Sequence, residues 1–181
     1  MRITGGTLRG RQVKVPGGLI RPAMDRMRES VFSVLGDITG TSFLDIFSGS
    51  GIIALEAASR GANYVEAVEM DSLKRSTLLS NVKISPVRIT CRFMSAELYV
   101  KRAKRPFDII FCDPPFPYKY KWELLQSIAA SPLMTESSRL LLHCPREDSM
   151  ANKPGENIIL EDFREYGRSV VNFFKFFRIK I

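Results

Sequence analysis

The chain has little of the side-chain chemistry that builds metal sites and disulfide frameworks. It contains one histidine, His143, and three widely spaced cysteines, Cys91, Cys112 and Cys144, with no Cys-x-x-Cys pair. A structural zinc site usually takes four such ligands, and a disulfide framework takes cysteines in even number. We therefore expect no metal site, reduced core cysteines of a cytosolic protein, and a structural role for His143 near a strand end.

Long apolar runs are also missing. No stretch approaches the roughly 18 apolar residues of a membrane helix, and the first six residues show no hydrophobic signal segment. The 181 residues are 45% hydrophobic and 25% charged, which is typical of a globular domain. These features predict one domain over residues 1–181, cytoplasmic, monomeric and without a membrane partner.

Acidic residues are scarce at the N-terminus. Residues 1–28 hold seven basic side chains against Asp25 alone, which accounts for +6 of the chain's net charge of +8. Such an excess favours contacts with nucleic-acid phosphates. The candidate phosphate contacts are Arg2, Arg9, Arg11, Lys14, Arg21, Arg26 and Arg28. Residues 1–24 are predicted to form a basic extension, with a small β-hairpin over 1–16 that stands off an α/β core of residues 25–181.

The core alternates between strand and helix patterns. An apolar helical stripe begins at Asp25 and ends near Ile38. Strands are predicted near 42–46, 64–69, 87–93, 107–113 and 138–144, and helices near 50–60, 72–84, 95–104 and 120–130. This alternation predicts a parallel sheet with helices on both faces. Two further strands after residue 157, joined at Gly167, are predicted to form an antiparallel edge.

A glycine turn follows the first predicted strand. Residues 44–51 read Leu-Asp-Ile-Phe-Ser-Gly-Ser-Gly and lead directly into a helix, so that ligands can approach the backbone closely. The candidate cofactor residues here are Asp45, Ser48, Gly49, Ser50 and Gly51. Glu69, which ends the next strand, can accept hydrogen bonds from a ribose. The glycine spacing fits both NAD and S-adenosylmethionine, but Asp45 would repel a pyrophosphate and suits an ammonium group, which favours S-adenosylmethionine.

A second motif, Asp113-Pro114-Pro115-Phe116, follows the apolar strand at 107–113. Two prolines cannot continue a β-ladder, so Asp113 is expected at the end of the strand. A carboxylate, a free Pro114 carbonyl and the Phe116 ring together suit a planar base with an exocyclic amine. Parallel strands place their C-terminal ends at one edge, so both motifs should line one cleft.

Basic and aromatic residues alternate in the segment 117–122, directly after this motif. We consider two interpretations equally good. The segment either begins a helix with core aromatics, or forms an RNA-contacting flap that uses Lys119 and Lys121.

Taken together, these motifs give the chain a resemblance to a known family. It resembles the bacterial 16S ribosomal RNA guanine-N2 methyltransferases, the methyltransferase D group of the small ribosomal subunit. The N-terminal part of the likeness is Arg2-Ile3-x-Gly5-Gly6, Arg9-Gly10-Arg11, Ile20-Arg21-Pro22 and Arg28-Glu29-Ser30-Val31-Phe32. It continues through residues 44–51, Ser59-Arg60-Gly61-Ala62, Val68-Glu69-x-Asp71, Asp113-Pro114-Pro115-Phe116 and Tyr166-Gly167.

The resemblance implies a class I (Rossmann-like) methyltransferase sheet of seven strands. The strand order is 3-2-1-4-5-7-6, with one antiparallel strand. It further implies an S-adenosylmethionine site that includes Met70, Ser95 and Ala96, and catalytic roles for Asp113, Pro114 and Phe116. Ser95 stands where the family usually has Asp. The implied substrate is a guanine of 16S rRNA, in the small ribosomal subunit or its assembly intermediate.

Three other functions compete with this interpretation. A DNA adenine-N6 methyltransferase would use the same pocket, but no separate target-recognition domain is evident in 181 residues. An NAD-dependent oxidoreductase fits the glycines alone, and an inactive rRNA-binding assembly factor fits the charge alone. Binding of S-adenosylmethionine and methyl transfer to small-subunit RNA would separate these possibilities.

Overall fold

The computed structural model of the chain describes residues 1–15, 22–148, 150 and 157–177. Within these ranges a single sheet has the strand order β3-β2-β1-β4-β5-β7-β6. The strands are β1 (Ser42–Ile46), β2 (Tyr64–Val68), β3 (Ile89–Arg92), β4 (Ile109–Cys112), β5 (Arg139–Pro145), β6 (Ile158–Tyr166) and β7 (Ser169–Phe176). β1 to β5 pair in parallel, whereas β7 is antiparallel to both β5 and β6. The predicted strand order and the single antiparallel strand are confirmed.

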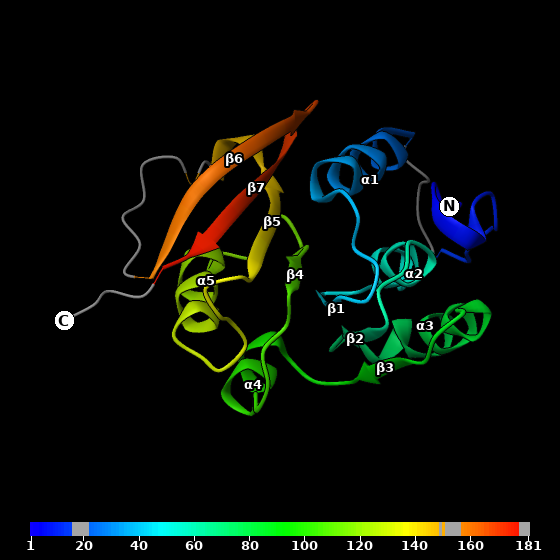
Figure 1. Cartoon of the computed structure of the whole chain (residues 1–181), viewed down its shortest axis with the longest axis horizontal. Coiled ribbons are helices and arrows are strands. Elements are labelled where there is room, and N and C mark those ends of the chain that lie inside the picture. The colour runs from blue at the N-terminus through cyan, green and yellow to red at the C-terminus, as the bar shows by residue number, and fades with distance from the viewer. Residues whose placement is uncertain (16–21, 149, 151–156, 178–181) are drawn as a thin grey trace.

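Helices cover both faces of the sheet, as predicted. They are α1 (Pro22–Leu35), α2 (Ile52–Ser59), α3 (Arg75–Asn81), α4 (Ala96–Lys101) and α5 (Lys121–Ala129), with short 3-10 helices η1 (Gly6–Leu8), η2 (Ser72–Lys74), η3 (Val82–Ile84) and η4 (Arg146–Asp148). Figure 1 shows α1, α2 and α3 on one side of the sheet and α4 and α5 on the other. Each layer has its own apolar core, which explains why all four residues of β4 are apolar and buried.

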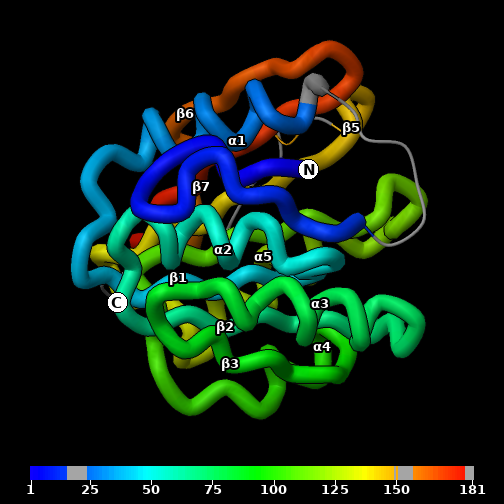
Figure 2. The backbone as a smooth tube through the Cα atoms, turned by 90° about the vertical axis from the view of Figure 1, so that its right-hand side faces the viewer, coloured from blue at the N-terminus to red at the C-terminus, as the bar shows by residue number. Residues whose placement is uncertain are grey.

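The N-terminal segment does not stand off from the domain, so that prediction was wrong. Only Arg2 and Gln12 form an antiparallel bridge, and η1 closes the turn between them. Ile3 and Val13 are buried against the same core as α1 and α2. Figure 2 shows the segment lying across α2. The two apolar side chains gain more by burial than they would on a detached hairpin.

Gly6 allows this close docking. Its φ is +74°, and a Cβ atom there would lie 1.9 Å from the Ser59 carbonyl oxygen. Ser59 also accepts a hydrogen bond from the Leu8 amide through Oγ at 2.8 Å, and donates one from Oγ to the Gly5 carbonyl at 2.6 Å. A side chain at position 6 would push the segment off α2.

The three cysteines lie on strands, as expected, and each is free: Cys91 on β3, Cys112 on β4 and Cys144 on β5. Among the residues that the structure describes, every helix is too short or too polar to cross a lipid bilayer.

Candidate active site

The turn after β1 is built from residues in unusual backbone conformations. Phe47, Gly49 and Gly51 have φ values of +65°, +57° and +80°. Glycine adopts this region freely, whereas Phe47 adopts it at an energetic cost, and such residues cluster at ligand sites. A Cβ atom on Gly51 would lie 2.6 Å from Leu78 Cδ1, so α3 packs directly against the turn.

Asp45 lies beneath this turn with its side chain buried. Its Oδ2 accepts hydrogen bonds from Ser48 Oγ at 2.6 Å and from the Ala54 amide at 3.1 Å, while Oδ1 has no partner among the described residues. Burial raises the pKa of Asp45 to about 7, and the negative charges of Asp113 and Glu69 add to the increase. An unsatisfied, buried carboxylate of this kind is stabilised by a nearby cation.

Glu69 connects β2 to the glycine turn. Its Oε2 accepts the Gly49 amide and its Oε1 accepts the Asp71 amide, both at 2.8 Å, and Lys74 Nζ lies 3.8 Å from Oε2. The carboxylate therefore lies at the end of β2, where the sequence predicts it, and it also holds the turn in place. Met70, the next residue, is 64% exposed and presents an apolar surface beside it.

Asp113 follows the end of β4, where its amide donates to the Ile46 carbonyl of β1 at 3.1 Å. One of its carboxylate oxygens, Oδ1, is 2.8 Å from His143 Nδ1. The Phe116 ring lies edge-on to the imidazole, with 5.9 Å between ring centroids, and is 41% exposed. The motif therefore offers a second carboxylate oxygen and an aromatic surface to a ligand.

His143 was missed as part of the site. The sequence predicts a structural residue near a strand end, and His143 does lie on β5, almost fully buried. The structure adds that its Nδ1 contacts Asp113 while Nε2 has no partner among the described residues. The signal that could have found it is its position: β5 neighbours β4, so its C-terminal residues lie beside Asp113.

The two prolines of the motif leave different acceptors. The Pro115 carbonyl accepts the Tyr118 amide at 2.8 Å, whereas the Pro114 carbonyl has no hydrogen bond to any described residue. In the loop between β3 and α4, Ser95 accepts the Leu98 amide at 3.2 Å and caps α4, and Ala96 is buried. The capping bond engages the Ser95 hydroxyl, so its expected contact with a donor molecule stays a prediction.

Two predicted phosphate contacts are corrected by the structure. Arg28 is fully buried and donates to Glu56, Asp25 and the Arg2 carbonyl, which leaves no group for RNA. Lys121 is also buried. Its ammonium group binds the Phe116 and Tyr118 carbonyls and lies 2.8 Å from Asp148. Both side chains hold the protein together, because burying a cation requires close acceptors.

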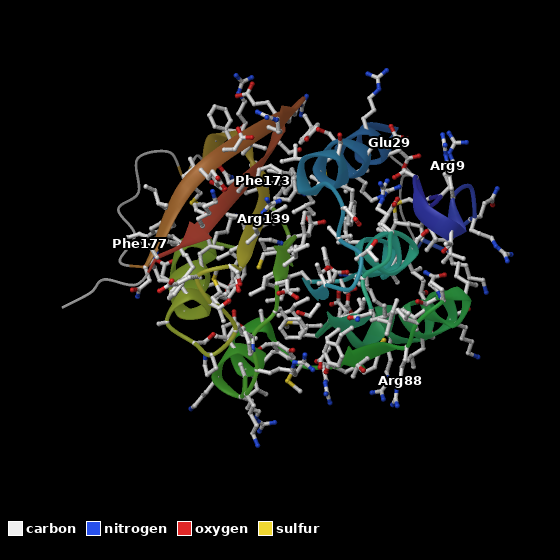
Figure 3. All side chains as sticks on the ribbon, in the orientation of Figure 1. Arg9, Glu29, Arg88, Arg139, Phe173 and Phe177 are labelled. Atoms are coloured by element: carbon white, nitrogen blue, oxygen red, sulfur yellow. The ribbon has the colours of Figure 1, made fainter. Side chains whose placement is uncertain are left out.

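The remaining described candidates lie on the surface. Arg9, Arg11, Lys14, Arg26 and Lys119 are exposed, and the Arg2 side chain is 72% exposed. Arg21 lies outside the described residues. In Figure 3 Arg9 projects away from the N-terminal segment. Their contact with RNA stays a prediction.

The fold and the site together define the class of protein. A dinucleotide-binding sheet is parallel with the order 3-2-1-4-5-6, whereas the antiparallel β7 inserted between β5 and β6 is the arrangement of the class I methyltransferases. The chain belongs to the family described as Conserved hypothetical protein 95, whose model matches residues 1–175. The resemblance to the methyltransferase D group is thereby confirmed, since relatives with that name are found.

One such relative is the Ribosomal RNA small subunit methyltransferase D of Escherichia coli K12, with 37% identity over 121 residues. That match covers 64% of this chain and 60% of the relative's length. A Bacillus subtilis protein provisionally named an rRNA methyltransferase is 29% identical to this chain. That match covers 97% of this chain and 98% of the relative's length. A solved Escherichia coli structure, provisionally named a methyltransferase, superimposes with a TM-score of 0.85 at 27% identity over 97% of both chains.

Proposed function

We propose that this chain transfers a methyl group from S-adenosylmethionine to the N2 amine of a guanine in 16S rRNA. The observation that carries the proposal is the meeting of Asp45, Glu69 and Asp113 at one sheet edge, beside the glycine turn and the Asp-Pro-Pro-Phe motif. The names of the relatives support the rRNA substrate. The N-terminal motifs of the resemblance support guanine N2 over other exocyclic amines.

The residues present fit the methyl donor. S-adenosylmethionine supplies an electrophilic methyl group on a positively charged sulfur. Asp45, buried with an unpartnered oxygen, suits the donor's ammonium group. Glu69 can accept from the ribose hydroxyls, Met70 can contact the adenine face, and the turn from Ser48 to Gly51 allows close backbone approach.

The acceptor groups fit an amine of low reactivity. The lone pair of guanine N2 is delocalised into the ring, so the nitrogen becomes nucleophilic only as it turns tetrahedral. The free oxygen of Asp113 and the unpaired Pro114 carbonyl can accept hydrogen bonds from the two N–H groups of the guanine amine. These bonds stabilise the positive charge that develops on the nitrogen. Phe116 can stack on the base and fix its orientation, after the base has been unstacked from the RNA.

His143 acts in this proposal as a positioning residue. By donating from Nδ1 to one oxygen of Asp113, it fixes the carboxylate so that the other oxygen faces the amine. A hydrogen bond to a charged group is worth about 1.5–3 kcal/mol.

Replacement of His143 by leucine should therefore lower kcat by about 10–100-fold, since each 1.4 kcal/mol corresponds to a factor of 10. The His143→Asn variant keeps a donor where Nδ1 lies and should recover most of the rate. Single-turnover methylation measures both, and calorimetry with S-adenosylhomocysteine should show donor affinity within a few-fold of wild type. Equal rates for the leucine and asparagine variants would remove this role.

Donor binding should weaken at low pH because of Asp45. Its pKa of about 7 lies well above the ordinary value of 3.8, so the carboxyl is charged above pH 7 and mostly neutral at pH 5.5. An ammonium group binds the charged form, so affinity should fall on the order of tenfold between pH 7.5 and pH 5.5. Titration calorimetry with S-adenosylhomocysteine measures it. The Asp45→Asn variant should bind with a flat pH profile, and a flat profile for wild type would contradict the assignment.

The proposed reaction is tested by mapping modified guanines in the small-subunit rRNA of cells with and without this protein. We expect one N2-methylguanine to disappear and to return with the wild-type gene. Loss of a methylated adenine instead would assign the chain to adenine chemistry. An unchanged rRNA would leave the chain without this substrate.

A further inference from the structure

A second concentration of positive charge lies in the middle of the chain. Residues 72–105 contain nine lysines and arginines and a single acid, Glu97, so this segment alone carries a charge equal to the net +8 of the whole chain. It comprises η2, α3, η3, β3 and α4. From the sequence alone the charge excess was predicted only at the N-terminus, because the positive charge of this segment is offset by acids elsewhere in the core.

Most of these cations are free on the surface. All except Lys74 are exposed. Lys74 pairs with Glu69 and Asp71, and Arg92 pairs with Glu66. Among the described residues the other seven form no ion pair with an acid: Arg75, Lys83, Arg88, Lys101, Arg102, Lys104 and Arg105. A solvated surface usually intersperses both signs, so seven unpaired cations favour an anionic partner.

Part of this surface is held rigidly. Glu66 of β2 is buried and accepts hydrogen bonds from Tyr64 Oη at 2.5 Å, Tyr99 Oη at 2.9 Å and Arg92 Nε at 3.1 Å. Burial acts to raise the pKa of Glu66, but these hydrogen bonds outweigh it and the pKa lies below its ordinary value. Arg105 stacks on the Tyr64 ring with its guanidinium carbon 3.8 Å from the centroid. Arg105, one of the seven unpaired cations, and its paired neighbour Arg92 are thus fixed to one buried carboxylate and its tyrosine.

The basic segment is continuous with the N-terminal one. The Lys14 amide donates to Asn81 Oδ1 at 3.0 Å, and Asn81 Nδ2 donates back to the Lys14 carbonyl at 2.9 Å, so residue 14 lies directly against the end of α3. In Figure 3 Arg9 projects upward from the N-terminal segment, and Arg88 projects downward below β3. A single basic surface therefore runs from the N-terminal segment over α3 to the edge strand β3 and the end of α4.

This surface extends to the N-terminal ends of the strands, whereas the active site lies at their C-terminal ends. Tyr64, under Arg105, begins β2, whereas Glu69 follows the end of the same strand. Five strand residues span roughly 16 Å, at about 3.3 Å per residue. A partner bound along the whole surface thus extends well beyond the methyl-acceptor pocket.

We propose that this surface, here called the β3-edge surface and defined by the seven unpaired cations named above, binds the phosphate backbone of an RNA helix away from the target base. The inference rests on the proposed rRNA substrate. Four of the seven are arginines, whose forked guanidinium groups suit phosphate oxygens. A lipid surface is the less favoured partner, because membrane-binding segments of this kind pair their basic residues with a broad apolar face.

The test uses full-length protein with Arg88, Arg102 and Lys104 replaced by glutamine. None of these side chains forms an ion pair or a hydrogen bond with another described residue, so the fold should tolerate the change. The matched control replaces Arg164, Arg168 and Lys175 on the β6–β7 hairpin, which lowers the net charge equally at the opposite edge of the sheet. Affinity for deproteinised 16S rRNA is measured across a salt series, with S-adenosylhomocysteine affinity and thermal unfolding as folding controls.

The first variant should bind 16S rRNA at least about tenfold more weakly near 0.1 M salt. The slope of log affinity against log salt should also flatten by about 2–3, at roughly 0.7–0.9 per lost contact. The control variant should keep wild-type affinity and slope. An equal loss of rRNA affinity in both variants would show that only the net charge of the protein matters, and it would overturn the proposal.

Unchanged RNA binding in the first variant would also overturn the proposal. Binding of the same variant to phosphatidylserine vesicles is measured alongside, and a loss of vesicle binding with unchanged RNA binding would assign the surface to a lipid membrane instead. These outcomes remain separate from the reaction. RNA affinity is measured without methyl transfer, so a failure of the guanine assignment leaves the comparison intact. If the first variant binds and methylates rRNA like wild type, the RNA-binding role of the β3-edge surface is rejected and the proposed methyl transfer is not.

Discussion

Replacement of Asp113 by alanine is expected to reduce methyl transfer by about 10²–10³-fold, the usual cost of removing one contact that strengthens in the transition state. The side chain contacts His143 through one oxygen, and in the proposed reaction the other oxygen accepts from the amine. Among the described residues it forms no hydrogen bond with the glycine turn that would hold the donor. The loss should therefore fall on kcat, with donor affinity within a few-fold of wild type.

Single-turnover methylation of rRNA and calorimetry with S-adenosylhomocysteine measure the two quantities separately. The Asp162→Ala variant is the control, since Asp162 lies on β6, pairs with Arg164 and accepts the amide of Phe163. It should react at the wild-type rate. Near-normal turnover in the Asp113 variant would move the active site away from this motif. A large loss of donor affinity would instead mean that Asp113 serves the methyl donor.

Replacement of Glu56 by alanine is expected to cost about 3–5 kcal/mol in the free energy of unfolding. Glu56 on α2 is fully buried, and its carboxylate accepts from Arg28 Nε, Arg60 Nε and the Thr4 amide at 3.3, 3.2 and 2.6 Å. Its removal leaves the buried Arg28 guanidinium without this partner. It also releases the N-terminal segment from α2, which should make residues 1–15 sensitive to proteolysis.

Denaturant unfolding followed by circular dichroism measures the loss. The Glu123→Ala variant is the control, because Glu123 is exposed on α5 and should change stability by less than about 0.5 kcal/mol. Replacing both Glu56 and Arg28 with apolar residues of similar volume should recover most of the stability, since no charge is then left buried. A Glu56→Ala variant as stable as the control would show that the ion pairs contribute nothing net.

Much of the fold could be predicted because its signals are local. The strands at 42–46 and 64–68, the glycine turn, and the antiparallel pair joined at Gly167 each follow from runs of apolar residues and from turn residues. The alternation of strands and helices then leaves few sheet orders. Asp45, Glu69 and Asp113 could be placed at one edge because the C-terminal ends of parallel strands meet there.

Predictions failed where the environment of a side chain decides its role. Arg28 and Lys121 look like surface cations in the sequence, yet both are buried. Glu56 of α2 accepts from Arg28, whereas Lys121 is held by the carbonyls of the turn before it and by the distant Asp148. His143 looks like an isolated strand residue, but the neighbouring strand brings Asp113 to 2.8 Å from it. The N-terminal segment resembles a detached hairpin, but α2 offers it an apolar surface and the Glu56 carboxylate.

The sequence by itself determined the class of fold, the glycine turn and the Asp-Pro-Pro-Phe turn after β4, because each depends on contiguous residues and backbone geometry. Only the tertiary structure decided which cations are free to meet a partner. Burial and pairing depend on residues far apart in the chain, as when Glu56 engages Arg28, or Glu66 fixes Arg92. The same cooperation of distant segments joins the N-terminal basic residues to those of α3 and β3 in one surface.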